Sequence, residues 1–387
     1  MFDRKIKNKL LQTANSFQVV AIFGPRQSGK TTLSKLAFPG YIYKNLEDPT
    51  EREFAVSDAR SFLKDADKGM IIDEIQNVPE LFSYIQVMVD SNRNAKFIIT
   101  GSQNYLLLEK ISQSLAGRVY LLRLLPFSID EIKSKYYPAN YHDFIFRGFF
   151  PPIYDRELSV SDWMPSYIQT YLERDVRQIK NITDLNVFQK FLQLCSGRIG
   201  QLVNTSSLGN DIGVSDKTIK SWLTVLETSF IVYLLKPYYN NFNKRIIKSP
   251  KMFFIDTGLA SSFLNIKNSE QAESHFLKGG LFENLILLEV LKFFVNKGEN
   301  PQLYFWRDNH GNEIDLIFEM NNVTYAIEIK AGGTISNTFF KGLDYFEKIT
   351  AGSPLKKIII YGGDQFQERK AGFVIPWNQL EKMFEIF

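Results

Sequence analysis

The 387-residue sequence contains one cysteine and three histidines. Cys195 alone cannot form an intramolecular disulfide, so we expect a reducing, cytoplasmic environment. The histidines, His142, His275 and His310, are scattered along the chain, which argues against a zinc cluster. No apolar run approaches the ~20 residues that cross a bilayer. The sequence therefore predicts a soluble protein without a membrane partner.

The sequence also has little net charge. Lys and Arg total 46 against 42 Asp and Glu, a net charge of +4, so any nucleic-acid contact has to rest on a local basic patch. Hydrophobic residues at 44% and charged residues at 23% are typical of globular chains. Disordered, collagen-like and coiled-coil classes are therefore excluded, and at roughly 100–200 residues per domain the length predicts two or three domains.

The apolar pattern changes twice along the chain. Up to about residue 130, short β-branched runs alternate with amphipathic stretches, which indicates a parallel sheet covered by helices; the runs are 18–23, 41–46, 70–72, 96–100 and 119–125. A helical region follows the prolines near 150. Strands with two-residue alternation then follow an apolar helix at 281–294. We predict an α/β domain at 1–150, a helical domain at 151–268 and an α+β domain at 269–387.

The first domain contains a phosphate-loop pattern, GxxxxGK[ST], between a predicted strand and a predicted helix. Its residues are Gly24, Pro25, Arg26, Gln27, Ser28, Gly29, Lys30 and Thr31. Glycines allow consecutive backbone N–H groups to surround a phosphate at a helix N-terminus. Lys30 is expected to reach the β- and γ-phosphates and Thr31 to bind Mg²⁺, with Thr32 completing the contacts. The predicted cofactors are ATP and Mg²⁺.

Two further buried strands end in polar residues. Asp73 and Glu74 follow the run Met70–Ile72; Asp73 is expected to hold Mg²⁺ through water, and Glu74 to orient or deprotonate the attacking water. A sensor of the γ-phosphate is expected at the end of the next strand, where Thr100, Ser102 and Asn104 are the alternatives, with Ser102 preferred. A polar turn without such a role is the simpler interpretation of that segment.

These motifs together resemble a known family. GPRQSGKTT, GMIIDEIQ, FIITGSQN and SLAGRV followed by LLPFSIDEI are similar to the AAA+-type ATPases of bacteria and archaea that carry a C-terminal domain of unknown function. The resemblance implies that Arg118 is an arginine finger or a sensor; a surface arginine that caps a helix is the alternative. The segment RGFFP at 147–151 departs from the paired glycine that the family leads us to expect, and we assign it no role.

The middle region predicts a helix-turn-helix from Leu208 to Leu226. Gly213 suits the turn, Ser215 suits the N-cap, and one apolar stripe recurs at helical spacing; the stripe is Ile219, Trp222, Leu223 and Leu226. The other face of the second helix is polar, and a basic, aromatic segment follows at 236–251, which resembles the wing of a winged helix; its cations are Lys236, Lys244, Arg245, Lys248 and Lys251. DNA and a protein partner are both open as ligands.

The last domain predicts a hairpin between 312–320 and 323–330, joined by Asn321 and Asn322, which tolerate positive φ. If Met320 pairs with Val323, then Asp315 lies opposite Glu328 and both carboxylates share a face with Lys330. Opposed like charges destabilise a hairpin, so a cation is needed there, either Lys330 or a divalent metal.

This spacing resembles the PD-(D/E)XK nuclease core, which implies a metal site of Glu283, Asp315 and Glu328 assisted by Lys330. We therefore expect an ATPase with Glu74, Arg118 and Lys30 as catalytic residues, coupled to a winged helix and a nuclease-like domain, and a homo-oligomer as a further expectation. The alternative is an ATP-gated binding or scaffold protein with slow hydrolysis and an inactive C-terminal domain.

Overall fold

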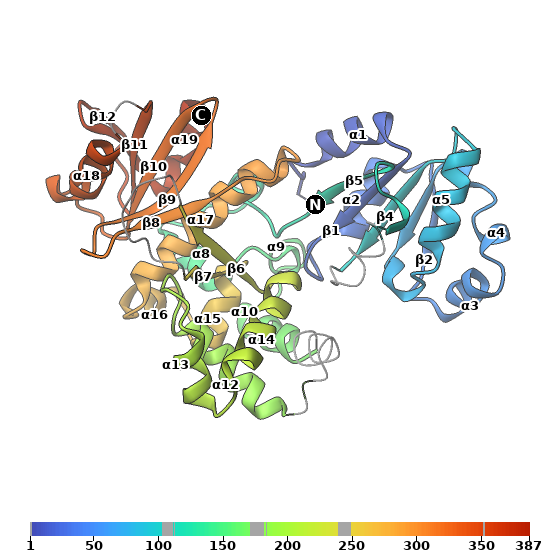
Figure 1. Ribbon diagram of the computed structural model, residues 1–387, viewed down its shortest axis with the longest axis horizontal. Coiled ribbons are helices and arrows are strands. Elements are labelled where there is room, and N and C mark those ends of the chain that lie inside the picture. Colours follow the sequence, from blue (N-terminus) through green and yellow to red (C-terminus); the bar gives the residue numbers. More distant parts are fainter. Residues whose placement is uncertain are drawn as a thin grey trace.

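The computed structural model describes residues 2–102, 111, 113–170, 182, 184–238, 249–350 and 353–387. Figure 1 shows two sheets at opposite ends of the molecule, with helices between and below them. We call the part from α1 to β5 the N-terminal unit and the part from α7 to α19 the C-terminal unit. Within the described ranges, no helix has the length and apolar character of a membrane span.

The N-terminal unit is built on five parallel strands in the order β2-β3-β4-β1-β5, which confirms the predicted parallel sheet. Each strand lies within a predicted apolar run or extends it by one residue. The elements are α1 (Lys7–Ser16), β1 (Val19–Phe23), α2 (Lys30–Ala37), β2 (Ile42–Asn45), α3 (Pro49–Ser57), α4 (Ala59–Phe62), β3 (Met70–Asp73), α5 (Leu81–Ser91), β4 (Phe97–Gly101) and β5 (Val119–Arg123).

Both faces of this sheet are covered, as the continuous apolar runs require. Along β1, Val19 and Ala21 pack with α5 on one face, whereas Val20 and Ile22 pack with α1 and α2 on the other. Because all strands are parallel, their carboxyl ends meet at one edge. The segments at 24–29 and 74 leave the sheet from that edge.

The C-terminal unit begins with helices and the predicted helix-turn-helix. Gly213 has φ 76° at the end of α13, Ser215 caps α14 by accepting a hydrogen bond from the Thr218 N–H, and the predicted apolar stripe of α14 is buried. The elements are α7 (Ile129–Ile132), α8 (Tyr141–Arg147), α9 (Pro151–Asp155), α10 (Val160–Tyr167), α12 (Leu185–Ser196), α13 (Thr205–Ile212), α14 (Asp216–Thr228), β6 (Val232–Pro237) and β7 (Lys251–Phe254).

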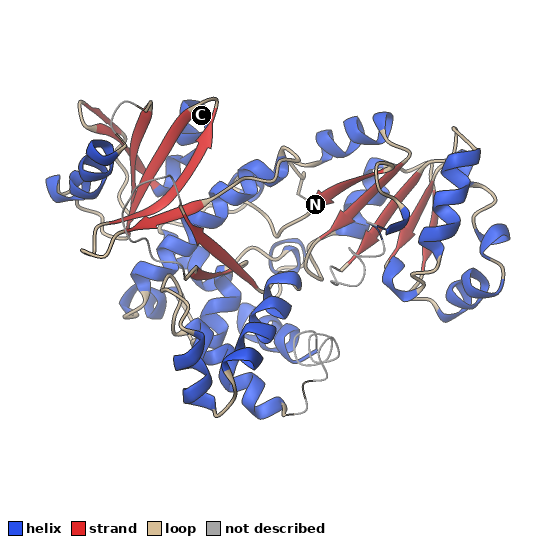
Figure 2. Ribbon diagram, in the orientation of Figure 1, coloured by secondary structure: helices blue, strands red, loops and turns tan. Residues whose placement is uncertain are grey.

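The second sheet has eight strands in the order β12-β13-β11-β10-β9-β8-β6-β7 (Figure 2). Its hairpin has the predicted register, with Val323 paired to Met320, and both Asn321 and Asn322 have positive φ. The remaining elements are α15 (Thr257–Phe263), α16 (Ser269–Ser274), α17 (Lys278–Asn296), β8 (Tyr304–Arg307), β9 (Glu313–Met320), β10 (Val323–Lys330), α18 (Lys341–Ile349), β11 (Leu355–Tyr361), β12 (Gln367–Arg369), β13 (Gly372–Pro376) and α19 (Leu380–Ile386).

One large hydrophobic core connects the helices of the C-terminal unit with one face of the second sheet, and a smaller cluster that includes Trp306 and Phe346 packs on the other face. The large core extends in sequence from Leu125 to Met383 and includes both the helices α12 to α15 and the long helix α17. In addition, β6 of the helical region pairs with β8 of the second sheet. The boundary predicted at residue 268 therefore does not coincide with a break in the packing.

Candidate functional site

The loop between β1 and α2 has the backbone that a phosphate loop requires. Gly29 has φ 93° and caps α2, and Gln27 has φ 63°, so two residues of the loop lie in the left-handed region. A Cβ at Gly24 would overlap the carbonyl oxygen of Leu124, so only glycine fits there. The glycines therefore allow the backbone conformation of the loop, as the motif predicts.

Lys30 points into this loop. Its side chain is buried, and Nζ donates hydrogen bonds to the carbonyl oxygens of Gly24 (3.1 Å) and Pro25 (2.9 Å). Burial lowers the pKa of Lys30, whereas the carboxylates of Glu74 and Asp73 act to raise it. An ammonium group held by neutral carbonyls can be drawn away by a stronger anionic acceptor.

Asp73 lies at the end of β3 and is surrounded by hydroxyl groups. The Thr31 hydroxyl donates to its Oδ2 at 2.7 Å, and Tyr43 donates to the same oxygen at 2.9 Å. The Thr100 hydroxyl donates to the other oxygen. Burial and the charge of Asp73 raise the pKa of Tyr43, which keeps it a donor. Thr31 and Asp73 thus bring two hard oxygen ligands together, which fits Mg²⁺.

Glu74 adopts a left-handed backbone, with φ 55° and ψ 49°. Gln76 donates from Nε2 to the Glu74 carboxylate and also to the Ser102 hydroxyl at 3.1 Å. Strained backbone of this kind is found at functional sites. Gln76 therefore joins two predicted site residues, Glu74 and Ser102. It ends the motif GMIIDEIQ and lies on the short helical turn Ile75–Asn77, but no role was predicted for it from the sequence.

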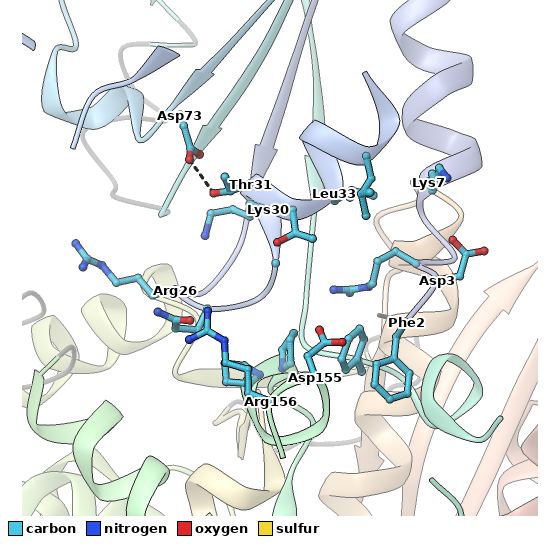
Figure 3. A pocket seen from close by; sticks show the side chains of 18 of the residues that line it. Phe2, Asp3, Lys7, Arg26, Lys30, Thr31, Leu33, Asp73, Asp155 and Arg156 are labelled. Carbon is cyan, nitrogen blue, oxygen red and sulfur yellow. Dashed lines mark hydrogen bonds between the residues drawn. The ribbon is translucent and has the colours of Figure 1, made fainter. Parts of the chain in front are cut away.

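Lys30, Thr31, Asp73 and Glu74 line a cavity of about 340 Å³ between the phosphate loop and two segments far away in sequence, whereas Gln76 and Ser102 are not among its lining residues. One segment is the chain start, with Phe2, Arg4 and Lys7; the other is α9 and its end, with Asp155 and Arg156. Figure 3 shows Asp73 and Thr31 on one side of the cavity and Asp155 and Arg156 on the other. The prolines near residue 150 fall in the second segment, but no motif in the sequence connects either segment to the loop.

Not every predicted residue reaches this cavity. Arg118 is not among its lining residues; it precedes β5 at the opposite edge of the sheet, where it forms a bidentate ion pair with Asp90 at 2.6 and 2.8 Å. This position does not fit a sensor in the same subunit, because the sheet separates it from the loop. An arginine finger that acts across a subunit interface stays a prediction. Asn104 lies outside the described residues.

The second predicted cluster comes together in the C-terminal unit. Lys330 contacts both Glu328 and Asp315, the latter at 3.8 Å, so the two carboxylates share a face as the register argument requires. Asp315 also accepts a hydrogen bond from the Ile329 N–H at 2.7 Å. Glu283 reaches the same cluster from α17.

Sequence reasoning missed the central residue of this cluster, Lys251. Its buried Nζ lies 2.8 Å from Glu283, 3.9 Å from Asp315 and in contact with Glu313. Burial lowers the pKa of Lys251, but these carboxylates raise it further, so the net shift is upward. Glu313 is also paired with Arg307. The basic segment had suggested that Lys251 contacts DNA, and its burial corrects that expectation.

The cation that the hairpin argument demanded is therefore an ammonium group. Across the described part of the chain, no three acidic, histidine or cysteine side chains form a group that could hold a metal ion. With Lys251 among Glu283, Glu313 and Asp315, the residues do not fit the divalent metal that the nuclease resemblance implies. Burial raises the pKa of Glu283 and Glu328, and the charge of Asp315 raises both further.

The polar face of the helix-turn-helix is partly used internally. Asp216 pairs with Lys220 and accepts a hydrogen bond from Thr205, whereas Lys217 remains on the exposed face. Lys244, Arg245 and Lys248 lie outside the described residues.

Three family models match successive parts of the chain. Residues 16–133 match an AAA domain, residues 138–270 a domain of unknown function (DUF8612), and residues 278–380 another domain of unknown function (DUF4143). The N-terminal unit is thus an AAA-type P-loop domain, which confirms this part of the resemblance.

Two mycobacterial proteins are similar over most of the chain. Uncharacterized protein Rv2008c of Mycobacterium tuberculosis and uncharacterized protein Mb2031c of Mycobacterium bovis are each 30% identical over 334 residues, which cover 85% of this chain and 74% of theirs. The chain belongs to their family. An uncharacterized protein of Haemophilus influenzae is 24% identical over 317 residues, 73% of this chain and 77% of that protein.

Similar solved structures include the Walker-type ATPase PABY2304 of Pyrococcus abyssi, with 14% identity and a TM-score of 0.42 over 68% of this chain and 96% of that one. The STAND protein PH0952 of Pyrococcus horikoshii has 14% identity and a TM-score of 0.26 over 75% and 46% of the two chains. Likeness at this level carries no conclusion about activity.

Proposed function

We propose that the protein hydrolyses ATP with Mg²⁺ in the cavity beside the phosphate loop. The observation that carries this proposal is the 2.7 Å hydrogen bond between Thr31 and Asp73 at the edge of a cavity that also holds Lys30. A phosphate-binding cation and two oxygen ligands for Mg²⁺ are the parts that phosphoryl transfer needs. They meet at the carboxyl edge of parallel strands, where such folds bind ligands.

Each side chain has a separate part in the proposed reaction. The Lys30 ammonium leaves the loop carbonyls for the β- and γ-phosphate oxygens. Thr31 and Asp73 would hold Mg²⁺, which when bound neutralises charge on the phosphates. The Glu74 carboxylate, oriented by Gln76, accepts a hydrogen bond from the attacking water and aligns it. Ser102, held by the same glutamine, senses the γ-phosphate.

We further propose that nucleotide binding is coupled to the C-terminal unit. Arg156, directly after α9, lines the cavity together with Arg26 of the loop, and both cations suit a triphosphate. The Tyr167 hydroxyl at the end of α10 donates to the Arg26 carbonyl oxygen at 3.4 Å. A ligand that attracts Arg26 and Arg156 therefore acts on both units at once.

A second candidate function is an ATP-gated binding or scaffold protein, and the position of Lys251 favours it over a metal-dependent nuclease. A buried ammonium among the expected metal ligands supports an ion network that orders the second sheet rather than a cleavage site. The helix-turn-helix of α13 and α14 is then the proposed partner surface, for DNA or for a protein.

One experiment tests the main proposal. ATP hydrolysis and nucleotide binding are measured for the wild type, Lys30→Ala and Glu74→Gln, with and without DNA, and DNA integrity is followed by gel. We expect Glu74→Gln to bind Mg²⁺–ATP but not hydrolyse it, and Lys30→Ala to lose both. Tight ATP binding by Lys30→Ala would refute the proposed nucleotide site. Metal-dependent nicking of DNA would favour a nuclease function over the ATP-gated scaffold function.

A further inference from the structure

An arginine at the chain start lies inside the nucleotide site. Arg4 lies three residues before the start of α1 at Lys7, yet its side chain is only 8% exposed. Nη1 donates to the Ser28 carbonyl oxygen at 2.8 Å, Nη2 to the Leu125 carbonyl oxygen at 2.7 Å and Nε to Glu131 at 3.0 Å. The guanidinium group also lies over the Phe127 ring at 4.8 Å. Arg4 thus joins three segments that are distant in sequence.

Glu131 is itself fixed by backbone groups from both sides. Its Oε1 accepts from the Lys5 N–H and its Oε2 from the Ser128 N–H, both at 2.9 Å, the latter as part of the capping box of α7. Its side chain is fully buried, and it pairs with Arg4. A planar guanidinium held at Nε by a fixed carboxylate has little freedom left to rotate. Glu131 therefore fixes the directions in which Nη1 and Nη2 of Arg4 donate to Ser28 and Leu125.

The hydrogen bond to the Ser28 carbonyl oxygen also affects the Gly29 N–H, because both groups belong to the same peptide unit. In a trans peptide the C=O and the following N–H point in opposite directions. Arg4 therefore determines the direction of the Gly29 N–H, one of the donors that a phosphate loop turns toward its ligand. Gly29 has φ 93° and no side chain, so this peptide can flip more readily than others.

We infer that Arg4 is a positioning residue of the nucleotide site, which holds the Ser28–Gly29 peptide in the orientation that binds phosphate. This inference rests on the proposed binding of ATP. In this role Arg4, which precedes α1, contributes to nucleotide binding. It also connects the phosphate loop to α7, the first element of the C-terminal unit. Without Arg4, the loop samples a flipped peptide that offers a carbonyl oxygen to the phosphate.

The test measures binding of Mg²⁺ with a non-hydrolysable ATP analogue to full-length variants, alongside their thermal midpoints. We expect Arg4→Ala to weaken binding about tenfold or more, the scale of lost hydrogen bonds to a charged group. Arg4→Lys keeps the charge but not the fork, and we expect it to recover little. Lys5→Ala is the matched control, because the Lys5 side chain is exposed and pairs with Asp130 at the surface.

Three readouts separate positioning from other roles. Glu131 does not line the cavity, so Glu131→Gln weakens binding only if it acts through Arg4, and the double variant should then be non-additive. Methylguanidinium should partly restore binding to Arg4→Ala. Full recovery by Arg4→Lys would mean that charge alone matters, and unchanged binding in both variants with a normal wild type would overturn the inference. If the wild type itself binds no better than Lys30→Ala, the proposed function fails first and this inference with it.

Discussion

At the scale of single residues, the nucleotide site depends on side chains that orient other side chains. Asp73 has three hydroxyl donors, and Glu74 is held by Gln76. None of Tyr43, Thr100 and Gln76 would touch a nucleotide's reacting atoms in the proposed mechanism. Their effect is to limit the rotation of two carboxylates, and a reaction that depends on alignment is sensitive to that limit.

The first prediction concerns Gln76. Gln76→Ala removes the donor that fixes the Glu74 carboxylate, so we expect the turnover number to fall about ten- to a hundredfold. ATP affinity should change little, because Gln76 does not line the cavity. Steady-state ATPase kinetics with a separate binding titration measure the two effects. Asn77→Ala is the matched control, since the neighbouring amide bonds the Leu46 carbonyl instead; equal losses in both variants would mean a general disturbance of the turn.

At the scale of elements, buried ionisable groups decide how helices and strands depend on conditions. His142 on α8 is buried, and neither ring nitrogen has a hydrogen-bond partner within the described part of the chain. Burial lowers the pKa of His142, with Glu273 raising it and Lys278 lowering it to a smaller extent. The histidine is therefore neutral in the fold at pH values where the unfolded chain already takes up a proton.

The second prediction follows from the sign of that shift. Because the unfolded state binds more protons below about pH 6.5, the stability that depends on neutral His142 is complete above that pH and is lost as the pH falls toward the folded-state pKa. Urea unfolding at pH 7.5 and 5.5 should show a smaller acid loss for His142→Leu than for the wild type. His310→Gln, at an exposed loop position, should behave as the wild type. An undiminished acid loss in His142→Leu would contradict the prediction.

The third prediction concerns the hairpin of β9 and β10. Lys251→Met removes the cation shared by Glu283, Glu313 and Asp315, so we expect a loss of about 3–5 kcal/mol, the cost of leaving buried charges unpaired. Mn²⁺ should then raise the thermal midpoint of Lys251→Met by filling the vacated position, but should leave the wild type unchanged. Lys357→Met, which breaks a pair with Asp344 and Glu347 outside the cluster, should gain nothing from Mn²⁺. A Mn²⁺ shift in the wild type would reinstate the metal site.

The same hairpin shows which structural features could be predicted from the sequence and which could not. The register of the hairpin and the face that holds Asp315 and Glu328 could be predicted from the two-residue alternation and from Asn321 and Asn322, because both depend only on residues close together in the sequence. The phosphate loop, Asp73 and Glu74 followed from a motif with its strand context. Lys251, Arg4 and Arg156 could not be found this way, since each reaches its site only when segments more than 20 residues apart fold together, and no period or spacing records that contact.

At the scale of the whole molecule, the chain that follows β5 is held against the C-terminal unit by hydrogen bonds, and the Tyr120 hydroxyl of β5 itself donates to the Gly298 carbonyl oxygen at 3.1 Å. The Phe127 N–H donates to the Phe149 carbonyl oxygen at 2.9 Å, and the Ile129 N–H donates to Glu289 of α17 at 2.9 Å. Glu289 in turn pairs with the buried Lys292, which lies 3.8 Å from the Phe149 ring. The RGFFP segment, to which the sequence assigned no role, thus lies between the nucleotide cavity and the core of the C-terminal unit.

The last prediction tests whether this contact transmits nucleotide binding. A ligand at 100 times its Kd stabilises the state that binds it by about 2.7 kcal/mol. Because α9 lines the cavity and Tyr167 of α10 bonds the loop, opening these helices disrupts the site, so their amides should exchange more slowly when Mg²⁺ with a non-hydrolysable ATP analogue is bound. Hydrogen exchange followed by mass spectrometry measures this in the full chain. Lys30→Ala should lose the protection, and α18, on the distant sheet (Figure 1), should show none in any variant. Protection confined to α2 and the loop would mean that the two units respond to nucleotide independently, and the coupling proposed from Arg26 and Arg156 would fall while ATP binding itself stood.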